Sequence, residues 1–215
     1  MDTEDSDIDC QCFFFPTAEE IIFNKKFQST TVPTKYGECV LKDIRSFFEE
    51  LRKSSPNTLE LLGTKYCIVN RDYHKIFSNM ANHIDTIARL NEYKLLKGYE
   101  GLYHKYTKII TEVRSMKNYV NAMRIMDAID TITTLPDWTY QLVLEPSEAE
   151  YYRSIKKCDF DIIFRPDYFD NRCFETQILL DNYFKNRFND SVGWIQDLIN
   201  DYQKQIMEKY LKLTF

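Results

Sequence analysis

The stretch SDIDCQCFFF, residues 6–15, decides the fold expected for this chain. Side chains of a β-strand alternate between two faces. One face of this stretch then carries two acids and a glutamine and the other is apolar: Asp7, Asp9 and Gln11 against Ile8, Cys10, Cys12 and Phe14. The alternation predicts a half-buried strand that Pro16 ends.

The residues that follow predict strand, helix, strand, helix. Thr17 is a typical N-cap ahead of acidic first-turn residues, so a short helix is expected over 18–23. A polar stretch over 28–35 interrupts the pattern, and a second strand is expected over 38–41. Helical spacing then begins: Leu41, Ile44, Phe48 and Leu51.

Farther along, apolar residues recur at a period of 3.6 from Tyr73 onward, which is typical of packed helices. Before that point, the residues 54–63 predict a capped element that Gly63 ends, and 66–69 predict a short strand. We therefore expect an α+β fold with a small mixed sheet, flanking helices and a mostly helical C-terminal region. A sheet lobe is expected over 1–70 and a helical lobe over 71–215.

The composition is that of an ordinary globular protein, with 44% hydrophobic residues, 28% charged residues, 5 Gly and 6 Pro among 215 residues. A net charge of -5 and a pI near 5.3 argue against a general positive field for nucleic acid, although a local basic cleft stays open. No window approaches the roughly 18 apolar residues that span a bilayer, and the start is acidic. These features predict a cytoplasmic protein with no membrane partner.

The six cysteines form no C-x-x-C pair, so they are expected to be free thiols. Cys10 and Cys12 share the apolar face of their strand, which predicts that both are buried. The three histidines lack the spacing of a zinc pair. Sequence motifs of P-loop enzymes, Rossmann dehydrogenases and α/β-hydrolases do not occur.

The chemistry of the chain is expected at the acidic face of residues 6–15. Asp7 and Asp9 project from one strand face about 7 Å apart at the backbone, so both carboxylates can converge on one cation. Mg²⁺, or Mn²⁺ in its place, prefers such oxygen ligands. Glu38, at the start of the second strand, is the candidate third acid. The alternative is a solvated strand face, because D-x-D pairs also arise by chance, as at 159–161.

Several blocks of the sequence resemble one family. They are SDID at 6–9 before an apolar strand, DIRSF at 43–47, SPNTLELL at 55–62 and KNYVNAMR at 117–124, with a fainter match at IKK, 155–157. Together they are similar to predicted nucleotidyltransferases of phages and bacteria, within the DNA polymerase beta-like superfamily. The likeness spans most of the chain at low identity.

The resemblance implies a fold and an activity. The expected activity is the metal-dependent transfer of a nucleoside monophosphate from an NTP to a hydroxyl of a nucleic acid or a protein. Asp7, Asp9 and Glu38 would be the catalytic metal ligands, with Glu38 in the place of the usual Asp. Lys117 and Arg124 would bind the nucleotide, the alternative for this pair being a solvated helix face. Glu60 would be a helix-start acid or a partner of a basic group.

Two departures from the family leave a second function open. The family carries a Gly-Ser pair ahead of the acidic strand that holds phosphates, whereas Met1 lies only a few residues before Asp7. The chain is then either a truncated form of the nucleotidyltransferase core or a degenerate relative, and the acidic lead-in over 2–5 favours truncation. Cys158 replaces a frequent Gly. The alternative function is a non-catalytic module for nucleotide sensing or protein interaction.

Overall fold

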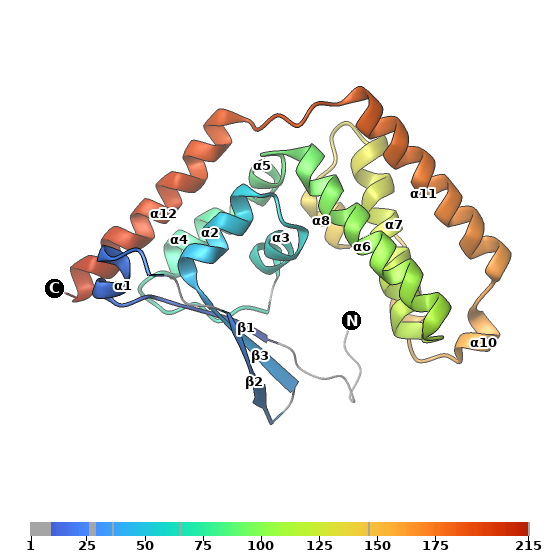
Figure 1. Ribbon diagram of the computed structural model, residues 1–215, viewed down its shortest axis with the longest axis horizontal. Coiled ribbons are helices and arrows are strands. Elements are labelled where there is room, and N and C mark those ends of the chain that lie inside the picture. Colours follow the sequence, from blue (N-terminus) through green and yellow to red (C-terminus); the bar gives the residue numbers. More distant parts are fainter. Residues whose placement is uncertain (1–9, 26–28, 36, 65, 146, 215) are drawn as a thin grey trace.

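The computed structural model describes residues 10–25, 29–35, 37–64, 66–145 and 147–214 (Figure 1). It has the α+β architecture expected from the sequence, with a small mixed sheet followed by a long helical region. Asp7 and Asp9 lie outside the described residues. The division into lobes at residue 70 stays a prediction, and one hydrophobic cluster contains residues from both sides of that position.

The sheet consists of β1 (Cys10–Phe14), β2 (Thr30–Thr34) and β3 (Gly37–Asp43), in the order β1-β3-β2. β1 runs parallel to the central strand β3, and β2 pairs with it antiparallel. The two expected strands are confirmed in their described parts. The interpretation of residues 28–35 as an interruption was wrong, because β2 lies there, and its Pro33 is tolerated at the edge of the sheet.

Helix α1 (Ala18–Ile22) begins as expected at Thr17. The Thr17 hydroxyl accepts a hydrogen bond from the Glu20 amide at 3.2 Å, and the Glu20 carboxylate accepts one from the Thr17 amide at 2.7 Å. This reciprocal capping satisfies two amides that the first turn leaves without a partner. It fixes the direction in which the chain leaves the sheet.

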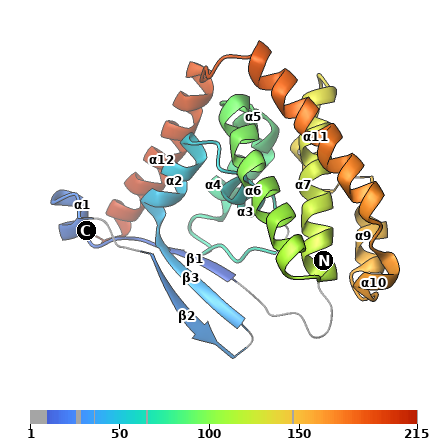
Figure 2. The same cartoon turned by 45° about the vertical axis from the view of Figure 1, so that its right-hand side comes forward.

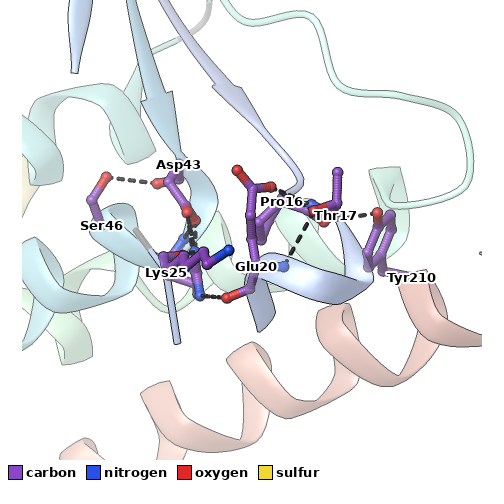
Figure 3. A network of polar contacts seen from close by, with 8 residues as sticks. Pro16, Thr17, Glu20, Lys25, Asp43, Ser46 and Tyr210 are labelled. Atoms are coloured by element: carbon purple, nitrogen blue, oxygen red, sulfur yellow. Dashed lines mark hydrogen bonds and ion pairs between the residues drawn. The ribbon is translucent and has the colours of Figure 1, made fainter. Parts of the chain in front are cut away.

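A buried ion pair ties α1 to the junction between β3 and helix α2 (Ile44–Arg52), as Figure 3 shows. Asp43 caps α2 and is only 2% exposed. Nε of Arg45 lies 3.0 Å from each Asp43 oxygen, and the same guanidinium donates to the carbonyl oxygens of Glu20, at 3.3 Å, and Lys25. The hydrogen bonds to the Asp43 carboxylate raise the pKa of Arg45, so the guanidinium stays charged.

The remaining helices form the bulk of the molecule. They are α3 (Pro56–Gly63), α4 (His74–Asn82), α5 (Ile84–Ala88), α6 (Glu92–Glu112), α7 (Met116–Thr134), α8 (Tyr140–Leu144), α9 (Ala149–Ile155), α10 (Phe160–Ile163), α11 (Pro166–Asn186) and α12 (Gly193–Thr214). The strand expected over 66–69 was wrong: no strand forms there, and Tyr66 and Ile68 are 91% and 104% exposed. None of the helices within the described ranges is long and apolar enough to cross a membrane.

The helices surround a core to which α7 contributes most along its length. α6 and α7 pack side by side, α11 lies along α7, and α12 returns across α2 and α4 (Figures 1 and 2). Arg52 of α2 donates to the side chains of Asn200, at 3.0 Å, and Gln203 on α12. The last helix thereby braces the helix that follows the sheet.

Glu50 fixes α3 relative to the sheet. Its carboxylate accepts from Lys42 of β3 at 2.8 Å and from the Thr58 hydroxyl of α3 at 2.6 Å. Thr58 is fully buried and Lys42 is half-buried. Charge-assisted hydrogen bonds of this kind hold three elements at one carboxylate.

Candidate functional site

The parallel pairing of β1 and β3 positions the expected third acid. Cys10 pairs with Cys39 and Gln11 with Val40, so Glu38 directly precedes the first residue of β3 that pairs with β1. Glu38 is exposed. It therefore lies at the start of the strand next to the one that Asp7 and Asp9 precede in the sequence.

The two faces of the sheet differ in what covers them. Gln11 and Phe13 share a face with Val40 and Lys42, and the Phe13 ring packs against Phe47 of α2 at a centroid distance of 5.1 Å. Alternation along β3 places Glu38 on this same face. It is the face to which the sequence alternation assigns Asp7 and Asp9, so the three acids are expected to share a face.

The opposite face carries the cysteines and corrects one expectation. Cys10 and Cys12 are exposed and Cys39 is half-buried, so the predicted burial of Cys10 and Cys12 was wrong. The covered face of β1 is the one with Gln11 and Phe13, where the Phe13 ring packs against Phe47, and not the face with Cys10 and Cys12 that the alternation indicated. A hydrogen bond to Cys10, with burial, raises the pKa of the Cys39 thiol to about 11.

A second group of polar residues surrounds a small hollow of about 70 Å³ between α3, α6 and α7. Five of its lining residues carry polar side chains: Asn57 and Glu60 from α3, Tyr106 from α6, and Asn121 and Arg124 from α7. The blocks SPNTLELL and KNYVNAMR, about 60 residues apart in sequence, meet here. Arg124 was expected as a site residue, and Glu60 is placed beside a basic group, one of its two expected roles.

Glu60 and Arg124 interact within the hollow. Burial raises the pKa of the Glu60 carboxyl, and the Arg124 charge lowers it to a smaller extent. A carboxyl with a raised pKa takes up and releases protons more readily near neutral pH than an ordinary glutamate. The hollow therefore combines a guanidinium, an acid and two carboxamides, which is a set able to hydrogen-bond a polar ligand.

α6 packs closely on the first turn of α3, next to this hollow. A Cβ at Gly98 would lie 2.6 and 2.7 Å from Cδ and Cγ of the Pro56 ring. The Tyr140 hydroxyl donates to the Pro56 carbonyl at 3.2 Å, so the Tyr99 hydroxyl, 3.3 Å away, is the donor to Tyr140. This buried chain of hydroxyls holds the first turn of α3, on which Asn57 lies.

The structure separates the two expected nucleotide-binding residues. Arg124 lines the hollow, whereas Lys117 is exposed one turn nearer the start of α7 than Asn121 and is not among the lining residues. Residues 117, 121 and 124 follow the i, i+4, i+7 spacing of one helix face. In Figures 1 and 2 the beginning of α7 lies toward the same lower side of the molecule as the first residues of β1.

Asn57, Tyr106 and Asn121 were not expected as site residues. The sequence signal that could have found Asn57 and Asn121 is the pairing of polar residues three positions apart, at 57 and 60 and again at 121 and 124. Nothing in either helix alone indicates that the two pairs face each other.

A larger hollow of about 480 Å³ lies at the other end of α6, near the connection between α11 and α12. Its lining includes Arg89, Glu92, Tyr183 and Arg187. Arg89 pairs with Glu92 at 3.6 Å, and Tyr183 donates to Glu92 at 3.3 Å. Glu38, Lys117 and Arg124, the expected site residues that the structure describes, are not among its lining residues.

Within the ranges that the structure describes, no three His, Cys, Asp or Glu side chains form a group able to hold a metal ion. Two of the three expected ligands, Asp7 and Asp9, lie outside those ranges. Glu38 fits the donor chemistry, since it is an exposed carboxylate on the strand adjacent to β1.

Comparisons with family models, with curated proteins and with solved structures give no match to this chain.

Proposed function

We propose that the protein is a metal-dependent nucleotidyltransferase that transfers a nucleoside monophosphate from an NTP to a hydroxyl acceptor. The observation that carries the proposal is the parallel register of β1 and β3. It puts Glu38 on the neighbouring strand and on the face assigned by alternation to Asp7 and Asp9. Three carboxylates that converge from two adjacent strands can hold the metal ions that such a transfer uses.

The residues of the chain have distinct roles in the proposed reaction. Asp7, Asp9 and Glu38 would hold Mg²⁺ or Mn²⁺, which when bound neutralises charge on the phosphates. The acceptor hydroxyl oxygen forms a bond to the α-phosphorus as the bond to the β-phosphate bridging oxygen breaks and pyrophosphate leaves. Glu38, exposed at its strand start, is positioned to take the hydroxyl proton.

The hollow between α3, α6 and α7 supports a nucleotide subsite. Arg124 can donate to a phosphate or to a base carbonyl, and Asn57 and Asn121 can both donate and accept. Lys117 lies on the same helix face nearer the start of α7, where it can contribute charge toward phosphates. The hollow is small, so it fits one end of a nucleotide rather than a whole one.

The proposal is tested with four α-³²P-labelled NTPs and Mn²⁺, with RNA and protein hydroxyls supplied as acceptors and pyrophosphate release measured in parallel. The double variant Asp7→Asn, Asp9→Asn and the single variant Glu38→Gln are expected to lose roughly 10²-fold or more of both signals. The matched control is Asp159→Asn, Asp161→Asn, which alters the other D-x-D pair; Asn at 159 still caps α10.

Equal loss in the control, or full labelling in the Asp7 and Asp9 variant, would exclude the proposed site. The alternative, a non-catalytic nucleotide-sensing module, gives a different pattern. It predicts NTP binding that Arg124→Met weakens, with no pyrophosphate release by the wild type. Calorimetry with each NTP separates the two functions.

A further inference from the structure

Two thiols lie directly opposite each other on the exposed face of the sheet. Cys10 of β1 and Cys39 of β3 are Cα partners in the parallel register, so their side chains project from the same face. Neighbouring strands lie about 4.8 Å apart, and disulfides span Cα separations of about 4.4 to 6.8 Å. The pair is thus already within the range of a covalent link.

Access and surroundings single out this pair among the cysteines. Cys10 is exposed, whereas Cys39 is half-buried between the other two strands. Cys12 is also exposed on this face, but its partner in the register is Leu41. A small oxidant therefore reaches Cys10 directly, and the nearest thiol across the strand pair is Cys39.

We propose that Cys10 and Cys39 form a reversible disulfide when the protein meets a hydroperoxide. The Cys10 sulfur attacks one peroxide oxygen, the O–O bond breaks, and water or an alcohol leaves with the Cys10 proton. The Cys39 sulfur then attacks the sulfenic sulfur of Cys10, the S–O bond breaks, and water leaves. Two thiols are oxidised by two electrons in total, and one peroxide is reduced.

The position of this bond gives it a consequence that rests on the proposed function. Cys10 directly follows Asp9, and Cys39 directly follows Glu38. A disulfide fixes the separation of the two positions that it joins. The expected ligand-bearing segments can then no longer adjust to a cation, and the oxidised protein is expected to bind Mn²⁺ more weakly than the reduced protein.

Peptide mapping tests the bond without reference to activity. The full chain is treated with hydrogen peroxide, free thiols are blocked, and the protein is digested with trypsin. The expected product joins the peptides 1–25 and 36–42, at a mass two hydrogen atoms below their sum, and a thiol reductant separates them. Cys12→Ser, the matched control on the same strand face, retains this product, whereas Cys10→Ser and Cys39→Ser lose it.

Several results would overturn the inference. They are persistence of the linked peptides in a Cys10→Ser variant that circular dichroism shows to be folded like the wild type, their loss in Cys12→Ser, and oxidation of Cys10 to sulfinic acid with no link. Mn²⁺ titration of the reduced and oxidised forms then tests the consequence separately. If the link forms and Mn²⁺ binds to neither form, the disulfide stands and the proposed function fails.

Discussion

Gly98 is required by the close approach of α6 to α3. A Cβ at this position would meet the Pro56 ring at 2.6 and 2.7 Å, and a proline ring has little freedom to move away. We expect Gly98→Ala to lower the free energy of unfolding by about 1 to 3 kcal/mol, measured by urea denaturation. Gly101→Ala is the control on the same helix, because no atom of the described residues outside the helix's own nearby backbone lies within 4 Å of a Cβ placed there. It should be neutral or stabilising by up to about 1 kcal/mol, and equal destabilisation of both variants would refute the packing argument.

Glu60 gives stability a defined dependence on pH. Burial raises the pKa of Glu60 in the folded protein above the ordinary glutamate value of 4.5. The contribution of Glu60 to stability is therefore fully present below pH 4.5, and it is lost as pH rises through the pKa of the folded protein. Glu60→Gln removes this loss. The free energy of unfolding of Glu60→Gln relative to the wild type should therefore increase from pH 4.5 toward neutrality.

Arg124→Met provides the second arm of this experiment. It removes the positive charge that lowers the pKa of Glu60, so the decline in stability with pH should be steeper than in the wild type. A stability difference between Glu60→Gln and the wild type that stays flat with pH would contradict the assigned burial of the carboxyl.

Among elements, α12 is anchored to the strand-to-helix turn by one tyrosine. The Tyr210 hydroxyl donates to the Pro16 carbonyl at 2.8 Å (Figure 3), and the Tyr210 ring stacks on Phe15 at a centroid distance of 4.6 Å. We expect Tyr210→Phe to cost about 0.5 to 1.5 kcal/mol of stability, because only the hydrogen bond is lost. Tyr210→Ala should cost more and should increase hydrogen exchange at the end of α12. Equal effects of the two variants would argue against the contribution of the ring stack.

The elements whose pattern is set by local physics could be predicted from the sequence. The Thr17 cap, the strands at β1 and β3, and the long helices α6, α7 and α12 follow from capping residues and from apolar spacing. β2 could not be predicted in the same way. Its residues are exposed, and its pairing with β3 rather than its own apolar content makes it a strand. The error at residues 66–69 is the reverse case, since strand-forming residues there have no neighbouring strand to pair with, and Tyr66 and Ile68 stay exposed.

For the whole molecule, long-range packing decides what sequence patterns leave open. The spacing of apolar residues indicates that α3, α6 and α7 contribute to a core, but it does not indicate which faces of these helices meet. The approach of Glu60 to Arg124 therefore depends on the tertiary fold. Likewise, alternation separates the two faces of β1 but indicated the wrong one as covered, because the packing of α2 on Phe13 is a tertiary contact. Candidate acids could thus be named from the sequence, whereas the polar hollow and the thiol pair required the structure.

The central claim is that Asp7, Asp9 and Glu38 meet at one cation. It is tested most directly by crystals of the full chain grown with Mn²⁺ and a non-hydrolysable NTP, with anomalous data collected at the manganese absorption edge. We predict an anomalous peak beside the starts of β1 and β3, within ligand distance of all three carboxylates and absent in Asp7→Asn, Asp9→Asn. A bound nucleotide whose manganese lies away from Glu38, or a Glu38 carboxylate directed away from both aspartates, would contradict the account.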